Sequence, residues 1–247
     1  MFSATHGINT HKGLVFASAI LCGALGKVHA GKSLPLPAEE VLSECRKLGS
    51  CSLGDLAKLS RHQNKLSPAS SIDMNSQDSR GSMPMDTKNH PPQAEPSALS
   101  NGERIFSAYG IQGARGEAAA GFPSAVRIGL PALKKWLAAC FSLNDAAAMA
   151  LLTLISEVDD TNMVHRGGPE LAKKSKEQAK HLLSAVTNDS FKEILSSLDE
   201  QYIAMHLSPG GCADLLAVSL MFHFLETCGM ISPVISSSLP HRRPPSM

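Results

Sequence analysis

The sequence contains few aromatic residues and no excess of charge of either sign. Phe, Trp and Tyr make up 4% of its 247 residues, and Ala, Leu, Ser and Met are plentiful, which favours helices over sheets. Lys and Arg number 23 and Asp and Glu number 22, which leaves a net charge of +1. This balance argues against binding driven by bulk charge, so we expect neither nucleic acid nor a membrane surface as a partner.

Cysteine pairs of the CxxC type are absent, and no ligand spacing supports a zinc site. We interpret the cysteines as small buried side chains of a protein from a reducing compartment. The six are Cys22, Cys45, Cys51, Cys140, Cys212 and Cys228.

No apolar run is long enough to predict a membrane span. The segment KGLVFASAILCGALGKVHA (12–30) is similar to a signal peptide, because an apolar stretch ends in a small-x-small pattern at Val28–His29–Ala30. Its basic region is a single lysine, however. The alternative is a buried amphipathic helix, and we favour the helix.

Long alternation of apolar and polar residues is also absent, so no strand is predicted. Pro37, Pro169 and Pro209 suit the first turns of helices, and Gly49 suits a helix stop. The sequence therefore predicts an all-α, single-domain helical bundle. The apolar helix at 144–158 should lie at its centre. The expected helices cover 13–27, 37–48, 53–60, a short segment capped by Ser100 or Asn101, 124–141 with an interruption at Pro131, 144–158, 169–186, 190–206 and 210–228.

One segment differs in composition from the rest. Residues 61–100 contain five prolines and eight serines but no Val, Phe, Trp or Tyr. Such a segment cannot bury enough apolar surface to offset the entropy lost on ordering. We therefore expect one helical domain from 1–60 and 98–231, a disordered insertion at 61–97 and a flexible tail at 232–247.

The stretch DDTNMVHRGGPE (159–170) places many polar groups directly after the central apolar helix. Glu157, Asp159 and Asp160 then crowd its C-terminal end, where the helix dipole disfavours each acid by about 0.3–1 kcal/mol. A cation would relieve this cost. Mg²⁺ is the natural candidate, since it prefers carboxylate oxygens and usually keeps water and substrate phosphates as further ligands. The alternative is a solvated acidic turn paired with Arg166 or a lysine.

Glycine pairs precede two of the expected helices, in HRGGPE (165–170) and SPGGCADLL (208–216). Glycines before a helix let backbone N–H groups approach an anion, and the helix dipole favours that anion. His165 and Arg166 add donors and charge to the first pair. Asp214 lies in the first turns of the helix that follows the second.

Two further stretches carry cations. NTHKG (9–13) places Lys12 at the N-terminal end of an apolar helix, where the helix dipole disfavours positive charge unless an anion binds. GARGEAAAGFP (113–123) supplies Arg115 and Glu117 between glycines. Each stretch alone also fits a surface turn. Together they suit a nucleotide polyphosphate with Mg²⁺, although the GxxxxGK[ST] pattern of a Walker loop is missing.

In this order, NTHKG, GARGEAAAGFP, DTNMVHRGG and SPGGCADLLAV resemble the ATP:dephospho-CoA triphosphoribosyltransferase family. The resemblance covers most of the chain outside 61–98 and the tail, and it includes the apolar helix after NTHKG, so we expect a cytoplasmic protein. It implies an all-α enzyme with ATP and 3′-dephospho-CoA as substrates. The product is the prosthetic-group precursor of the citrate lyase or malonate decarboxylase acyl carrier protein, used downstream by a holo-acyl-carrier-protein synthase.

The implied reaction is attack of the 2′-hydroxyl of dephospho-CoA on C1′ of the ATP ribose, with loss of adenine. It needs a base, a donor for adenine, and Mg²⁺ with cations on the triphosphate. We expect catalytic roles for Glu117, Asp160 and His165. The expected metal ligands are Asp159, Asp160 and Asp214. The expected substrate- and phosphate-binding residues are Asn9, His11, Lys12, Arg115, Asn162, Arg166, Gly167, Gly168, Gly210 and Gly211.

Members of this family carry a TPKPGLVD-like segment ahead of NTHKG, whereas eight residues precede Asn9 here. A shortened, non-catalytic nucleotide- or CoA-binding relic of the family is therefore the alternative function, and it would bind ATP without releasing adenine. A helical interaction protein, in which the motifs serve capping and packing, would bind no nucleotide.

Overall fold

The computed structural model describes residues 11–63, 101–187 and 190–234. Within these ranges the chain is helical, and the one β-type pairing is an isolated bridge between Leu36 and Ile231. The all-α prediction is confirmed. The helices are α1 (Lys12–His29), α2 (Ala38–Gln63), α3 (Asn101–Tyr109), α4 (Gly113–Ala119), the π-helix η1 (Ala125–Gly129), α5 (Leu130–Ala138), α6 (Leu143–Glu157), α7 (Thr161–Ala185), α8 (Phe191–Ala204) and α9 (Gly210–Thr227).

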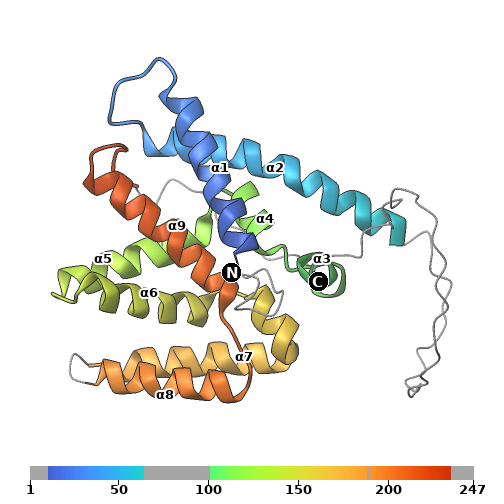
Figure 1. The fold of residues 1–247 in the computed structure, drawn as a ribbon, viewed down its shortest axis with the longest axis vertical. Coiled ribbons are helices and arrows are strands. Elements are labelled where there is room, and N and C mark those ends of the chain that lie inside the picture. The colour runs from blue at the N-terminus through green and yellow to red at the C-terminus, as the bar shows by residue number, and fades with distance from the viewer. Residues whose placement is uncertain (1–10, 64–100, 188–189, 235–247) are drawn as a thin grey trace, which may run out of the picture.

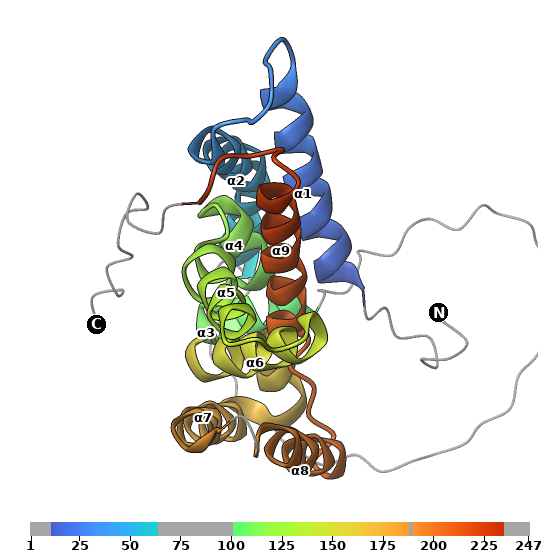
Figure 2. The ribbon, with the colours of Figure 1, turned by 90° about the vertical axis from the view of Figure 1, so that its left-hand side faces the viewer.

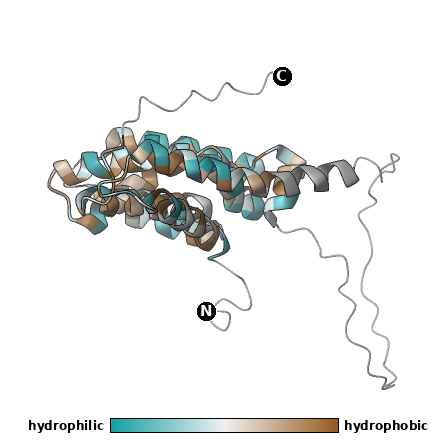
Figure 3. Cartoon of the chain, turned by 90° about the horizontal axis from the view of Figure 1, so that it is seen from above, coloured by the Kyte–Doolittle hydropathy of each residue, from teal (hydrophilic) through white to brown (hydrophobic). Residues whose placement is uncertain are grey.

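The helices are stacked along the longest axis of the molecule (Figures 1 and 2). α1 and α2 pack together at one end, α5 and α6 lie in the middle, and α7 and α8 lie side by side at the other end. α9 crosses the middle and contacts α1, α4, α5, α6 and α7. Hydrophobic and hydrophilic residues succeed one another along the helices (Figure 3), as expected where each helix buries one face.

α6 lies at the centre of the bundle, as its sequence predicts. It contacts α5, α7, α9 and η1. Met149, Leu152 and Leu154 are buried although they point in different directions around the helix axis. Ser142 caps its start by accepting a hydrogen bond from the backbone N–H of Asp145 at 3.2 Å. An apolar helix surrounded by others is therefore the core of the fold.

One face of α1 packs against the rest of the bundle. The expectation that its apolar run is too short to span a bilayer is wrong by length and composition: among the described residues, α1 is the one helix long and apolar enough to cross a membrane, a property shared by core helices and signal sequences. Ala17, Leu21 and Ala24 are buried in the core. The helix contacts α2, α4 and α9. The helix predicted at 13–27 is confirmed, and one of its faces belongs to the core of the bundle.

The predicted helix stop at Gly49 is wrong, because α2 continues to Gln63. Gly49 is buried where α2 packs on α4, and a Cβ at this position would lie 2.4 Å from the carbonyl carbon of Ala118. Two helix backbones can approach this closely only where no side chain lies between them. Gly49 is therefore a packing residue and not a cap.

Pro131 and Pro169 each follow a change in the helical backbone. Pro131 lies in the first turn of α5, directly after η1, which accounts for the predicted interruption. Pro169 starts the second of two helical pieces of α7, and Gly168 between the pieces has φ 75° and ψ 169°. The first piece, from Thr161, is missed by sequence reasoning because a Gly-Gly-Pro run is typical of a helix boundary and not of a kink.

The predicted burial of the cysteines is confirmed for Cys45 and Cys212 and is wrong for the other four. Apolar neighbours in a helical run do not determine which face of the helix a given residue occupies. All six thiols are free, and the exposed ones are Cys22, Cys51, Cys140 and Cys228.

The first residues of the predicted tail are held by the fold. The Ser232 backbone N–H donates to the Leu36 carbonyl at 2.8 Å, and the Ser232 hydroxyl accepts from the Ala38 N–H at 3.0 Å, at the start of α2. The Val234 N–H donates to Glu226 at 2.6 Å. The rest of the predicted tail, and 64–97 of the predicted insertion, lie outside the described residues.

We expect Gly49→Ala to lower the free energy of unfolding by about 1–3 kcal/mol, because its methyl group must push α2 and α4 apart. Gly26→Ala is the matched control. No atom lies within 4 Å of a Cβ at Gly26 in α1, so this change should stabilise the protein by about 0.5–1 kcal/mol through helix propensity. Urea unfolding of both variants tests the pair, and equal effects of the two substitutions would contradict the packing role of Gly49.

Candidate functional site

Asp160 joins the starts of two helices. Its Oδ1 accepts hydrogen bonds from the backbone N–H groups of Asn162 at 2.7 Å and Met163 at 3.1 Å, and its Oδ2 accepts from that of Cys212 at 2.7 Å. One carboxylate therefore caps α7 and also binds the first turn of α9. The side chain is buried, and burial raises the pKa of Asp160 while the three N–H groups oppose that rise.

This geometry corrects the interpretation of the acidic cluster. Asp160 lies at the positive end of α7, where a carboxylate is favoured, and not at the negative end of α6. Asp159 pairs with Lys176 at 2.8 Å, and Glu157 pairs with Lys180 at 3.5 Å. These two acids thus form the alternative arrangement, an acidic turn paired with lysines. The helix-dipole argument for a cation therefore does not apply to Asp160, while Glu157 remains at the C-terminal end of α6.

Asp214 holds the start of α1 in a similar way. A Cβ on Gly13 would lie 2.0 Å from Oδ2 of Asp214, so this carboxylate lies directly against the glycine backbone. It accepts a hydrogen bond from the Leu14 N–H. Burial, followed by the charge of Asp160, raises the pKa of Asp214 to about 6, and His11 opposes the rise. A carboxyl group with this pKa can exchange a proton near neutral pH.

Motif glycines lie where polar side chains of other motifs touch the backbone. A Cβ on Gly210 would lie 2.5 Å from Nδ2 of Asn162, and one on Gly211 would lie 3.2 Å from the carboxylate of Asp160. A Cβ on Gly113 would lie 3.1 Å from the first residue of α7. The starts of α4, α7 and α9 therefore converge, and larger residues at these glycines would separate them.

Glu117 is held by the turn that follows α4. Its Oε1 accepts from the Ser124 hydroxyl at 2.7 Å, and its Oε2 accepts from the Ser124 N–H at 3.0 Å. The intervening turn contains Gly121 at φ 78° and Phe122 at φ 55°, and Phe122 is fully buried. Left-handed backbone at a non-glycine residue is strained and clusters at functional sites. Glu117 lies near the start of α9, because α4 contacts α9 and because Glu117, after burial and the charge of Asp160, helps to raise the pKa of Cys212 in the first turn of α9.

Two of the motifs also carry basic side chains. His11 and Lys12 are exposed at the start of α1, next to the helix start that Asp214 holds. Arg115 is half-buried in α4 and pairs with Glu103 of α3 at 3.3 Å. Asn9 lies outside the described residues.

The HRGG stretch joins the two pieces of α7 and does not precede the whole helix. His165 and Arg166 are exposed and lie more than one turn along α7 from Asp160. A Cβ on Gly167 would lie 2.7 Å from Leu207, so this glycine permits close packing, while Gly168 forms the kink. The structure thus separates this group from the cluster at the helix starts.

The three predicted metal ligands do not share one position. Within the described ranges, no group of three or more His, Cys, Asp or Glu side chains is arranged to hold a metal ion. Asp160 and Asp214 are close enough for their charges to interact. Asp159 is exposed and paired with a lysine. The structure therefore brings together two of the three carboxylates.

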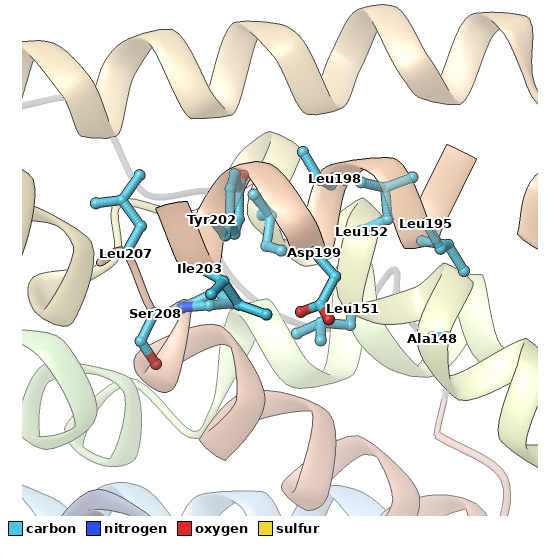
Figure 4. Close-up of a pocket in the computed structure, with 12 residues that line it drawn as sticks. Ala148, Leu151, Leu152, Leu195, Leu198, Asp199, Tyr202, Ile203, Leu207 and Ser208 are labelled. Atoms are coloured by element: carbon cyan, nitrogen blue, oxygen red, sulfur yellow. The ribbon is translucent and has the colours of Figure 1, made fainter. Parts of the chain in front are cut away.

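An apolar cavity of about 280 Å³ lies between α6 and α8, beside the start of α9 (Figure 4). Leucine and isoleucine side chains form most of its wall, and Asp199 is its one charged lining residue. Burial raises the pKa of Tyr202, which also lines it. Because no lysine or arginine lines this cavity, it offers no charge complement to a polyphosphate.

A sequence comparison identifies the family to which this chain belongs. The pattern of the family described as ATP:dephospho-CoA triphosphoribosyl transferase matches residues 1–231. The chain belongs to this family. The matched range includes the four stretches that carry Lys12, Glu117, Asp160 and Asp214. No solved structure matches the chain.

Curated relatives carry one printed name, probable 2-(5″-triphosphoribosyl)-3′-dephosphocoenzyme-A synthase. The chain is 36% identical to the protein from Streptococcus equi subsp. zooepidemicus (strain MGCS10565), over 92% of this chain and 69% of the relative. It is 34% identical to the Streptococcus mutans protein over the same shares. For the Vibrio cholerae protein (strain M66-2) the identity is 32%, over 91% of this chain and 62% of the relative.

Sequence reasoning missed Ser124, which orients Glu117, and Thr161, which packs on Gly113. The signal for Ser124 is weak, because it lies seven residues after Glu117 across a turn whose geometry the sequence does not reveal. Thr161 directly follows Asp160 and was obscured by the interpretation of that segment as the end of α6.

We expect Asp160→Asn to destabilise the protein by roughly 2–4 kcal/mol, because the amide nitrogen would face a backbone N–H instead of accepting from it. Asp159→Asn is the matched control, since its exposed ion pair contributes about 0–1 kcal/mol. Thermal and urea unfolding provide the comparison. A similar small effect of both changes would contradict the role of Asp160 as a double cap.

Asp214 should make stability depend on pH. Between 3.8 and about 6, the folded protein keeps the proton on Asp214 that the unfolded chain has already lost. The folded state therefore binds more protons, and this contribution to stability falls as pH rises through that window. Asp214→Asn can still accept from the Leu14 N–H, and it should remove this dependence. Melting temperatures of both proteins across the window test the prediction, and parallel curves would contradict the raised pKa.

Proposed function

We propose that this chain transfers the triphosphoribosyl group of ATP to the 2′-hydroxyl of 3′-dephospho-CoA. Family membership and the printed name of the relatives support this activity. The observation that carries it is the convergence of all four family motifs at the starts of α1, α4, α7 and α9, around Asp160.

In the reaction, the 2′-oxygen of dephospho-CoA forms a bond to C1′ of the ATP ribose. The bond between C1′ and adenine breaks, and adenine leaves with the bonding electrons and takes up a proton. The hydroxyl proton passes to a base on the enzyme. Because the sugar becomes oxocarbenium-like, the protein must hold two nucleotides in register and keep water away from C1′.

The triphosphate belongs at the starts of α9 and α1. Gly210 and Gly211 lie at the N-terminal end of α9, an 18-residue helix whose dipole favours an anion. Lys12 is exposed at the start of α1, where an anion would offset its unfavourable position. Arg115 is a further candidate, since a guanidinium can bind phosphate through two hydrogen bonds. A phosphate contact of Arg166, which lies more than one turn along α7 from Asp160, stays a prediction.

Glu117 is the candidate base. Ser124 holds both of its carboxylate oxygens, which fixes its direction, and it lies near the start of α9. Asp160 has a positioning role in this proposal, because its oxygens already accept three backbone N–H groups. A role for His165 in protonating adenine stays a prediction.

Mg²⁺ would enter with ATP, and Asp214 is the side chain best placed to hold it. Burial, and after it the charge of Asp160, raises the pKa of Asp214, and a nearby cation would be stabilised by both carboxylates. Substrate phosphates and water would supply the other ligands, as is usual for this ion. Bound there, Mg²⁺ would neutralise triphosphate charge.

The product is a prosthetic-group precursor for the acyl carrier protein of citrate lyase or malonate decarboxylase. A holo-acyl-carrier-protein synthase would use it next, in the cytoplasm. These assignments rest on the family resemblance and extend beyond the printed names of the relatives.

We expect Glu117→Gln to reduce the rate of adenine release by about 10²–10⁴-fold, because the amide cannot take the hydroxyl proton. ATP affinity should change little. Glu39→Gln, in an exposed ion pair with Arg46 on α2, is the control and should retain full activity. Chromatography of adenine formed from ATP and dephospho-CoA gives the rate. Wild-type protein that binds ATP but releases no adenine would support the non-catalytic relic instead.

A further inference from the structure

A second cavity, of about 400 Å³, lies between α6 and the second piece of α7. Asp160 forms part of its wall, so the cavity adjoins the cluster at the helix starts. Lys173, Lys176 and Lys180 line one side, and their spacing places them on one face of α7. Apolar side chains such as Ile155 line another part of the wall. The cavity therefore combines a cationic edge with an apolar surface.

The lysines are available to an anion. Lys176 and Lys180 are engaged in ion pairs with Asp159 and Glu157, and both of these carboxylates are exposed. Such pairs contribute little to stability, so a phosphate can replace them at small cost. Lys173 has no carboxylate partner in the part of the chain that the structure describes.

Two nucleotides must approach each other for the proposed transfer. The triphosphate of ATP lies, in the proposed function, at the starts of α9 and α1, and the first turn of α9 binds Asp160 directly. The lysine-lined cavity shares Asp160 with them and extends along α7. A second substrate in this cavity could therefore bring its reacting end to the same carboxylate.

We propose that this cavity binds the diphosphate and the pantetheine arm of dephospho-CoA, an inference that rests on the proposed function. The diphosphate carries negative charge that the three lysines complement, although Asp159, Asp160 and Glu177 also line the cavity. The arm begins with a gem-dimethyl group, which the apolar wall can bury. ATP has no apolar extension beyond its phosphates and would leave that wall uncovered. The cavity between α6 and α8 lacks cations and does not fit a diphosphate.

Lys173→Gln tests the diphosphate contact, with Lys174→Gln as the matched control. Lys174 is the next residue along the same helix, is exposed, and does not line the cavity. We expect Lys173→Gln to weaken dephospho-CoA binding by about three- to tenfold, as for loss of one partly solvated charge contact. ATP binding should not change, and Lys174→Gln should affect neither ligand. Calorimetry with each ligand alone gives the affinities.

Ala172→Leu tests the arm, because Ala172 lines the cavity and a larger side chain would occupy it. This variant should weaken dephospho-CoA binding more than ADP binding, since ADP has the diphosphate and no arm. Its melting temperature shows whether it folds. Ala204→Leu, at an exposed position in α8, is the control for the substitution itself.

The outcomes separate this proposal from the transferase activity. Dephospho-CoA binding that depends on Lys173, in a protein that releases no adenine, supports the cavity assignment and defeats the proposed reaction. Adenine release with an unchanged dependence on dephospho-CoA concentration in Lys173→Gln overturns the cavity assignment and leaves the reaction intact. Equal weakening of ATP and dephospho-CoA also overturns it, because the lysines would then serve the triphosphate.

Discussion

The positions of the functional groups depend on one carboxylate, that of Asp160, which binds the starts of two helices and reaches Cys212, 52 residues further along the chain. A buried carboxylate is costly unless its oxygens receive hydrogen bonds, and here three backbone N–H groups supply them. Those N–H groups are also the ones that a helix start leaves without partners. The carboxylate therefore caps both helices, and their N–H groups offset the cost of burying it. These hydrogen bonds hold the start of α7 against the start of α9.

The same pairing of an acid with a glycine recurs around the site. Asp214 lies against Gly13, and Asp160 lies against Gly211. Each glycine admits a carboxylate that a side chain would exclude, so the acids and glycines of different motifs are partners in packing. One consequence is electrostatic, because burial, followed by the charge of the nearby Asp160, raises the pKa of Asp214 to about 6. The contacts that pack these two acids against the glycines therefore also contribute to the raised pKa of Asp214.

Close packing of helices outside the four motifs also positions Glu117. Gly49 lets α2 approach α4, the helix that carries Glu117. A Cβ on Gly129 of η1 would lie 2.2 Å from the hydroxyl of Ser219 in α9, and that hydroxyl donates to the Ala125 carbonyl in η1. These contacts place the turn that contains Ser124 beside α9. The direction of Glu117 therefore depends on backbone approaches made by residues with no chemistry of their own.

The sequence by itself determined the helical class, most helix positions and the family, because helical periodicity is a local property and four motifs in a fixed order are specific. It also identified Asp160, Asp214, Glu117 and the glycines as a set. Only the tertiary structure decided what each of them does. An acid between two helices can end the first or cap the second. A glycine can stop a helix, as predicted at Gly49, or let another backbone approach. In both cases the outcome depends on which distant segment packs against the residue. Asp160 and Asp159 are adjacent and chemically identical, yet one is buried under three N–H groups and the other is paired with a surface lysine, because only one of them faces the start of α9.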